Sequence, residues 1–282
     1  MAKGVQLKGA VVAITGGGRG IGLAIAKAMV GQGARVSLGD IDAALAVEAA
    51  APLCGYGGRL DVRDRESFAL FLEATRQQLG PIDVLINNAG IMPIGAFTDE
   101  TDAMSDTQID INLRGVIHGC KAALPAMLAR GTGHIVNVAS LAGVMPVPGL
   151  AVYCATKFAV LGLTQTLREE YRDSGVHFTT IMPSKVRTEL ASGSDAAKGI
   201  PSVSPGHVAR SVVDAIVHQR REVAVPSYLG ATPAFLNLTP QWLMRRFRRA
   251  IDDRAGLEKI DHQKRASYTQ RIESLTVEKQ LR

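Results

Sequence analysis

The residues whose types and spacing could do chemistry together are a tyrosine, a lysine and a serine in the middle of the chain. Lys157 follows Tyr153 by four residues, and Ser140 precedes Tyr153 by thirteen. A free phenol with a pKa near 10 is mostly the wrong species to accept a proton at neutral pH. On a helix, Lys157 lies one turn from Tyr153, so its ammonium could stabilise the phenolate and lower that pKa. These residues therefore predict proton transfer to or from an alcohol or carbonyl oxygen, which Ser140 could bind and orient.

A glycine-rich segment near the N-terminus could bind the phosphates of a dinucleotide. Residues 15–22 read TGGGRGIG and lie between an apolar run and a helical pattern. Glycine adopts the positive φ of a tight turn and lets a pyrophosphate approach the backbone without a Cβ in the way. The helix that begins near Gly20 directs free N–H groups and its positive dipole end at the same place. The residues expected to bind the pyrophosphate are Gly16, Gly18, Arg19, Gly20, Ile21 and Gly22.

Asp40 ends the second expected strand, twenty residues beyond Gly20. A carboxylate there can accept hydrogen bonds from the adenosine ribose and repels a 2′-phosphate, which favours NAD over NADP. Arg19 argues the other way, since a basic residue in this loop could meet a 2′-phosphate. Asp40 could also cap the following helix. We expect the carboxylate to decide, with NAD as the cofactor.

Polar residues also follow the third and fourth expected strands. Each short segment alone is typical of a turn. At the carboxyl ends of successive strands they would meet at one cleft, where the adenine and the second ribose would lie. The residues expected to line this part of the cleft are Asp61, Val62, Asn88, Ala89 and Gly90.

The elements that must position these residues alternate between short apolar runs and longer segments of helical periodicity. The runs are rich in valine and isoleucine and largely unalternated, as in strands covered on both faces. Five of them span 10–14, 35–38, 82–86, 135–138 and 178–182, and a further strand, the third in chain order, is expected just before Asp61. The helical segments span 21–30, 65–79, 106–130 and 153–171. Strand–helix–strand repetition implies right-handed crossovers and an α/β fold, with a parallel sheet between two layers of helices.

The motifs TGxxxGxG, NNAG and YxxxK, with Asn112 and Ser140 between the last two, resemble the short-chain dehydrogenase/reductase family in its compact single-domain form. The resemblance covers about Lys8 to Pro226. It implies a Rossmann-type doubly wound parallel sheet and a catalytic group of Asn112, Ser140, Tyr153 and Lys157. It also implies that Asn112, a poor helix former, interrupts its helix and holds water that links Lys157 to solvent.

After the sixth expected strand, the family usually has Pro-Gly, a small apolar residue and a threonine. Residues 183–188 read PSKVRT here, so Ser184 replaces the glycine and the local backbone could differ. By the resemblance, Val186 and Thr188 meet the nicotinamide carboxamide and the phosphates, and Pro183, Tyr153 and Lys157 also belong to the cofactor site. The stretch 184–205, rich in serine, glycine and alanine, is a candidate mobile lid.

The net charge of +6 lies almost wholly in the C-terminal tail, where residues 241–282 hold 11 basic against 6 acidic side chains. The main body therefore has no electrostatic footprint for nucleic acid, and a small alcohol or ketone is the expected partner. Cys54, Cys120 and Cys154 match no metal or disulfide spacing, so no metal is expected. The sequence also shows no secretory signal and no apolar run of spanning length, which favours a cytoplasmic protein.

We expect a catalytic domain over 1–226 and a helical C-terminal extension over 227–282. Residues 242–249 of the extension combine apolar and basic side chains. They could lie on a membrane surface, but we favour packing on the lid or on a neighbouring subunit. Residues 260–282 are polar and expected to fray. The tail loosely resembles those of family members that act on retinoids, steroids and other lipids, which favours a lipophilic substrate. Family members mostly associate through the helices at 106–130 and 153–171, which implies a homodimer or homotetramer.

Three functions stay open from the sequence. The leading one is an NAD-dependent alcohol dehydrogenase and carbonyl reductase. The second is an NADPH-dependent reductase of 3-oxoacyl chains or other carbonyls, against which Asp40 argues. The third is a dinucleotide-binding protein without turnover, which would have no need of Lys157 four residues after Tyr153.

Overall fold

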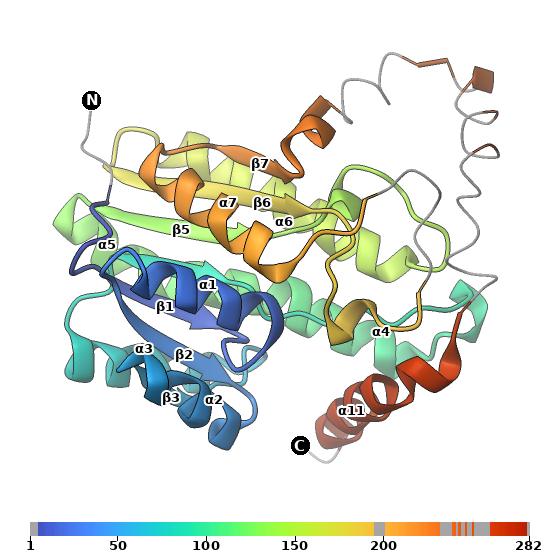
Figure 1. The fold of residues 1–282 in the computed structure, drawn as a ribbon, viewed down its shortest axis with the longest axis horizontal. Helices are drawn as coiled ribbons and strands as arrows, with labels where there is room; N and C mark the ends of the chain where they lie inside the picture. The colour runs from blue at the N-terminus through green and yellow to red at the C-terminus, as the bar shows by residue number, and fades with distance from the viewer. Residues whose placement is uncertain are drawn as a thin grey trace.

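A computed structural model of the chain describes residues 5–194, 201–231, 239–240, 242–243, 246, 250 and 260–280 (Figure 1). Seven strands form one parallel sheet in the order β3-β2-β1-β4-β5-β6-β7. They are β1 Val11–Thr15, β2 Arg35–Asp40, β3 Tyr56–Arg59, β4 Val84–Asn87, β5 Gly133–Val138, β6 Val176–Pro183 and β7 Glu222–Val225. The order reverses between β1 and β4, which makes the sheet doubly wound. In such sheets ligands bind beyond the carboxyl ends of the strands at this reversal.

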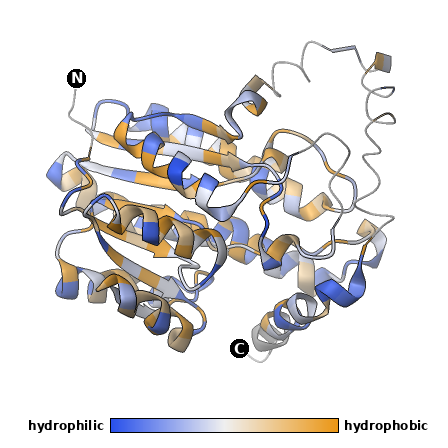
Figure 2. Ribbon diagram, in the orientation of Figure 1, coloured by the Kyte–Doolittle hydropathy of each residue, from blue (hydrophilic) through white to orange (hydrophobic). Residues whose placement is uncertain are grey.

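Helices cover both faces of the sheet, as the sequence predicts. One layer contains α1 Gly20–Val30, α2 Ala43–Ala50 and α7 Pro205–Val217, and the other contains α3 Arg65–Leu79, α5 Gly115–Arg130 and α6 Ala151–Glu170. The first layer buries residues such as Ile25 and Val212 against the sheet, and the second buries Phe68 and Val160. Of the strands between them, β1 and β4 are buried along their whole length. Figure 2 shows hydrophobic residues in the central strands of the sheet.

The five strands expected from apolar runs all form, with ends within two residues of the predicted ones. Strand β7 and helix α7 were not predicted. β7 escaped because it has only four residues and begins at the exposed Glu222, so no apolar run marks it. The helix expected at 106–130 is interrupted: α4 Asp102–Ile109 is followed by a π-helical turn at Asp110–Arg114 and then by α5.

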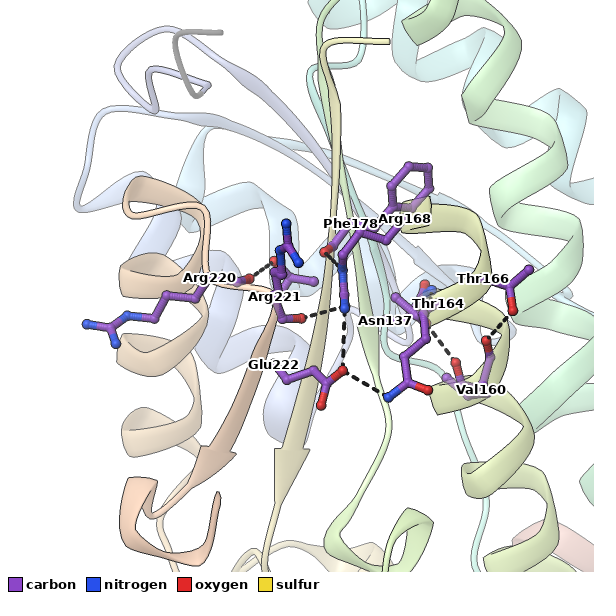
Figure 3. A network of polar contacts seen from close by, with 12 residues as sticks. Asn137, Val160, Thr164, Thr166, Arg168, Phe178, Arg220, Arg221 and Glu222 are labelled. Carbon is purple, nitrogen blue, oxygen red and sulfur yellow. Dashed lines mark hydrogen bonds and ion pairs between the residues drawn. The ribbon is translucent and has the colours of Figure 1, made fainter. Parts of the chain in front are cut away.

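Helix α6, which carries the tyrosine and lysine of the YxxxK motif, is fixed to the sheet at its far end by Arg168 (Figure 3). The guanidinium donates to the backbone oxygens of Phe178 at 3.3 Å and of Arg221 at 2.8 Å. It also lies 3.4 Å from the Glu222 carboxylate, which accepts a second hydrogen bond from Gln165 at 3.0 Å. One end of α6 is therefore tied to both β6 and β7, which limits how far its other end can shift at the site.

Residues 262–280 form a helix, α11 His262–Gln280, so the expectation that the C-terminal segment frays is wrong. α11 lies beside α4 at the carboxyl end of the sheet (Figure 1). Tyr268 and Ile272 are buried in the same core cluster as α3, α5 and α6, and Leu275 packs against it. These residues recur at helical spacing, so a narrow apolar stripe holds an otherwise polar helix on the domain.

The structure describes only part of the candidate lid and only part of the basic segment in the C-terminal extension. The two ends of the stretch 184–205 are joined by a parallel β-bridge between Val186 and Val203. Residues 195–200 of this candidate lid lie outside the described residues. Most of the basic segment 242–249 also lies outside them. None of the helices in the described part of the chain has the length and apolarity required to span a bilayer.

Candidate active site

Two neighbouring cavities open at the carboxyl end of the sheet. The glycine-loop cavity, of about 270 Å³, is lined by residues 16 and 19–21, by the segments that follow β2, β3 and β4, and by α11. The tyrosine cavity, of about 200 Å³, is lined by the segments that follow β4, β5 and β6 and by the start of α6. Five residues line both, so the two cavities form one continuous cleft: Ile21, Asn88, Gly90, Thr188 and Leu190.

The structure brings nearly all the predicted site residues to this cleft. Those that line the glycine-loop cavity are Gly16, Arg19, Gly20, Ile21, Asp40, Asp61, Val62, Asn88, Ala89, Gly90 and Thr188. Those that line only the tyrosine cavity are Ser140, Tyr153, Lys157, Pro183 and Val186. Three predicted residues line neither cavity: Gly18, Gly22 and Asn112. Each of them contacts a residue that does.

The glycine loop is held in place by the residues around it. Gly16 and Gly20 adopt φ of +61° and +56°, which side chains other than glycine rarely tolerate. The amide nitrogen of Asn88 donates to the backbone oxygens of Thr15 at 2.9 Å and of Gly16 at 3.2 Å. Gly22 is required for close packing, because a Cβ there would lie 2.1 Å from the Gly16 carbonyl oxygen. These contacts hold the turn in its conformation.

Gly22→Ala is expected to lower the free energy of unfolding by about 2–3 kcal/mol, because the backbone of the loop must shift to admit the methyl group. It should also weaken dinucleotide binding. Gly162→Ala is the matched control: Gly162 is an exposed residue inside α6 with open space at the Cβ position. This control should raise stability by about 0.5–1 kcal/mol. Chemical denaturation of both variants tests the pair, and equal stabilities would contradict the packing argument.

Asp40 presents a nearly buried carboxylate to the glycine-loop cavity, with 9% of the residue exposed. Its Oδ2 accepts a hydrogen bond from the Gly18 N–H at 3.1 Å, and its Oδ1 accepts one from the Asp42 N–H at 3.3 Å. The N-cap of α2 is Asp42, whose side chain accepts from the Leu45 N–H. Asp40 is therefore not the cap, and its charge stays at the cavity.

Asp61 lies where the sequence places it, but its carboxylate has a partner that the sequence analysis missed. Arg63 donates to Asp61 Oδ1 from Nε at 2.9 Å and to Oδ2 from Nη2 at 2.8 Å. The third nitrogen of Arg63 donates to the backbone oxygen of Leu275 in α11 at 2.8 Å. The end of the cleft expected to hold adenine is thus closed by an ion pair that reaches the C-terminal helix.

Tyr153, Lys157 and Ser140 meet at the tyrosine cavity. The Tyr153 hydroxyl shares a hydrogen bond with Ser140, and the Ser140 Oγ also accepts from the Ala142 N–H at 3.1 Å. Lys157 extends beneath the tyrosine, with Nζ at 5.6 Å from the centre of its ring, and donates to the Val138 carbonyl oxygen at 2.9 Å. A substrate oxygen that enters the cavity would therefore meet two hydroxyl groups.

The pKa shifts of Tyr153 and Lys157 differ from those expected from the sequence. Burial raises the pKa of Tyr153 well above its usual value, and only the hydrogen bond with Ser140 opposes this. Lys157 is buried as well, and this burial lowers its pKa to about 8. The expected lowering of the Tyr153 pKa by Lys157 is not found: removal of the phenolate from water is the largest influence, and the hydrogen bond with Ser140 is the only one that lowers this pKa. In this state Tyr153 is a neutral phenol, the form that can donate a proton.

Asn112 lies in the π-helical turn, so the interruption that the resemblance implies is present. Its side chain bonds both backbone groups of Ile91: the Ile91 N–H donates to Oδ1 at 2.8 Å, and Nδ2 donates to the Ile91 oxygen at 2.9 Å. A Cβ built on Gly90 would lie 3.2 Å from Asn112 Oδ1 and 3.7 Å from Lys157 Nζ. The amide and the ammonium therefore approach the same point, and a π turn places the amide there.

Two groups of lining residues were missed from the sequence. The first lies in the apolar wall of the tyrosine cavity, which comprises Met92, Ile94, Leu141, Ala142, Met145, Val147, Leu150, Leu190 and Ala191. The segments 144–150 and 184–205 were expected to shape the pocket, so the residues missed in this wall are Met92, Ile94, Leu141 and Ala142. The wall residues lie on loops and in two three-residue 3₁₀ helices, which are too short for periodicity to mark them. The second comes from α11 and comprises Tyr268, Arg271, Ile272 and Leu275, whose helical spacing was a readable signal.

Comparison with known proteins agrees with this geometry. A family model described as short chain dehydrogenase matches residues 10–199. "Oxidoreductase UcpA" of Escherichia coli (strain K12) is 39% identical over 237 residues, which cover 82% of this chain and 88% of that protein. "2-(S)-hydroxypropyl-CoM dehydrogenase 3" of Xanthobacter autotrophicus is 39% identical over 188 residues, which cover 64% of this chain and 73% of that protein.

A solved structure shows the same fold with a dinucleotide bound. It is a crystal structure of a short chain dehydrogenase/reductase from Burkholderia phymatum in complex with NAD. It superposes with a TM-score of 0.75 at 26% sequence identity and covers 82% of this chain and 93% of that one. The fold, the cleft and these relatives lead to one conclusion: the chain belongs to the short-chain dehydrogenase/reductase family of oxidoreductases.

Proposed function

We propose that the protein is an NAD(H)-dependent oxidoreductase that interconverts a lipophilic secondary alcohol and its ketone. One observation carries the proposal: the hydroxyls of Ser140 and Tyr153 lie together in an apolar cavity that opens into the glycine-loop cavity. An apolar body with a single oxygen to bind fits such a space. A relative named as a dehydrogenase of 2-(S)-hydroxypropyl-CoM supports an alcohol as the substrate class.

The glycine-loop cavity suits a dinucleotide. Any side chain at Gly16 or Gly22 would fill the turn, and the amino-terminal end of α1 faces the cavity at Gly20. A pyrophosphate there would accept hydrogen bonds from free backbone N–H groups. The nicotinamide, when bound where the two cavities join at Asn88 and Thr188, supplies the hydride acceptor or donor.

The residues of the chain would then position the substrate and move the proton. Ser140 donates a hydrogen bond to the substrate oxygen and holds it near Tyr153. Tyr153 gives its proton to that oxygen during reduction and accepts it during oxidation. Lys157 stabilises the phenolate that reduction leaves, and its Nζ exchanges a proton toward solvent on the side of Asn112. The apolar wall excludes bulk water from this exchange.

Asp40 supports NAD as the cofactor. Its buried carboxylate lies in the cavity at the end of β2, where it would repel a 2′-phosphate. The solved relative that contains NAD agrees with this assignment. An NADPH-dependent reductase is the rival, because Arg19 lines the same cavity. Arg19 lies 3.5 Å from Glu189, which partly neutralises it.

The cofactor assignment predicts a preference for NAD⁺ over NADP⁺ of about 100-fold in kcat/KM, from charge repulsion of a few kcal/mol. Asp40→Asn should reduce this preference by about 10-fold or more. Asp42→Asn removes a neighbouring exposed charge outside the cavity, keeps an N-cap, and should leave the preference unchanged. A wild-type preference for NADPH would instead favour the reductase.

The substrate class is tested with secondary alcohols graded from short aliphatic chains to steroids, followed by NAD⁺ reduction at 340 nm. Activity should rise with lipophilicity. Saturable dinucleotide binding without turnover of any alcohol or ketone would favour the non-catalytic alternative. A homodimer or homotetramer that associates through α4, α5 and α6 stays a prediction, which light scattering on the purified protein would check.

A further inference from the structure

Helix α11 runs along the whole cleft and contacts it at three levels. Beside the tyrosine cavity, Arg265 donates to backbone oxygens of the segments that follow β4 and β6. Six residues later, Arg271 donates to the Glu189 carboxylate at 2.6 Å. Near the carboxyl end of β3, the backbone oxygen of Leu275 accepts from Arg63. α11 thus spans the distance from the substrate end of the cleft to the expected adenine end.

At the middle level, two guanidinium groups converge on one carboxylate oxygen. Nη1 of Arg19 lies 3.5 Å from Oε2 of Glu189, the same atom that Arg271 binds. Both arginines line the glycine-loop cavity. A Cβ on Gly20 would lie 3.6 Å from Thr188, so the start of α1 faces this cluster. Two positive charges against one negative leave a net positive charge at a helix N-terminus, where phosphate binds best.

The ion pair between Arg271 and Glu189 is open to exchange. The two side chains are 35% and 37% exposed, so the pair is partly solvated and contributes little to stability by itself. Burial raises the pKa of Glu189, but the hydrogen bond with Arg271 and the charges of both arginines lower it below its usual value. Glu189 is therefore a carboxylate at neutral pH. A pyrophosphate has more charge and more acceptor oxygens, and guanidinium groups bind such anions in bidentate fashion.

Building on the proposed function, we propose that α11 completes the dinucleotide site and that Arg271, together with Arg19, binds the pyrophosphate of the cofactor. Glu189 then serves as an internal carboxylate that occupies both arginines and competes with the pyrophosphate for them. The buried side chains of Tyr268 and Ile272 hold the helix in the position from which Arg271 reaches the cavity.

The test compares ligands with and without the pyrophosphate. Dissociation constants of ADP-ribose and of adenosine are measured by calorimetry, with competition for the weaker ligand, in wild type and in Arg271→Gln. We expect Arg271→Gln to weaken ADP-ribose about 10-fold and adenosine less than about 2-fold. Arg271→Lys should recover part of the loss. Lys264→Gln is the control on the same helix, because Lys264 is exposed and lines neither cavity.

A second variant separates binding from support of the helix. Glu189→Gln removes the competing carboxylate, so it should tighten ADP-ribose by about 2- to 5-fold even though it breaks the same ion pair. Two variants with opposite effects on affinity fit only a direct contact. If both variants weaken ADP-ribose alike, or if Arg271→Gln leaves its affinity unchanged, Arg271 is not a pyrophosphate ligand. A wild-type protein that binds no ADP-ribose would contradict the proposed function as well.

Discussion

Tyr153→Phe is expected to lower kcat by roughly 10³-fold, because it removes the hydroxyl that exchanges a proton with the substrate oxygen. Dinucleotide affinity should stay within about 2-fold of wild type, since the glycine-loop cavity does not include Tyr153. The measurement is steady-state turnover with the best alcohol of the graded panel, together with NADH binding followed by fluorescence. A variant that keeps more than a tenth of wild-type turnover would assign proton transfer to another group.

The pH dependence of the wild type adds a second readout. Burial keeps Tyr153 protonated at neutral pH, so reduction, which needs the phenol, should be nearly independent of pH there. Oxidation needs the phenolate and should accelerate as the pH rises. Tyr171→Phe is the control: it removes a hydroxyl from the C-cap residue that follows α6, away from both cavities, and should leave both profiles unchanged.

Lys157→Met is expected to lower kcat by about 10²-fold or more, and to do so without a matching loss of stability at pH 7. The activity falls because no ammonium remains to stabilise the phenolate. Stability is largely kept because Lys157 is 4% exposed and its charged form is held out of water at a cost. Removal of this buried charge should therefore stabilise the fold. The substitution also leaves the Val138 carbonyl oxygen without its hydrogen bond, which offsets part of that stabilisation.

The sign of the pH effect follows from the lowered pKa. Lys157 titrates at about 8 in the folded protein and near 10.5 when unfolded. Below pH 8 both states hold the proton, so the stability difference between wild type and Lys157→Met is flat. Between these values the unfolded chain binds more protons, so wild type gains stability over the variant as the pH rises, by about 3 kcal/mol in all.

Denaturant unfolding of both proteins from pH 7 to 10.5 measures this difference. Lys121→Met, on the exposed face of α5, is the matched control and should follow wild type in activity. A stability difference that does not change with pH would show that Lys157 is not buried as a charged group. A fall of the wild type relative to the variant would give the opposite sign and contradict the lowered pKa.

Much of the fold and most of the candidate site could be predicted from local sequence. Short apolar runs mark the five central strands, because strands covered on both faces admit few polar residues. The glycines of the loop are marked by a backbone requirement, since Gly22 has no room for a Cβ. Tyr153 and Lys157 are paired by one helical turn, and this spacing holds whatever packs around it.

The rest depended on contacts between residues far apart in the chain. Leu275 meets Arg63 and Arg271 meets Glu189 only because α11 folds back over the cleft, and the polar composition of 260–282 hid the stripe that holds it there. The apolar wall of the tyrosine cavity comes from loops and two three-residue 3₁₀ helices, so no pattern marks it.

The sequence by itself determined the glycine loop and the pairing of Tyr153 with Lys157, because each is a local requirement of backbone or helix geometry. Only the tertiary structure decided the charge states of Tyr153 and Lys157. Burial raises the pKa of Tyr153 and lowers that of Lys157, and the desolvation that causes both shifts is produced by every element packed around them. Desolvation depends on all the residues packed around a group and leaves no motif in the sequence. The positions of Tyr153 and Lys157 could therefore be predicted from the sequence, but their protonation states could not.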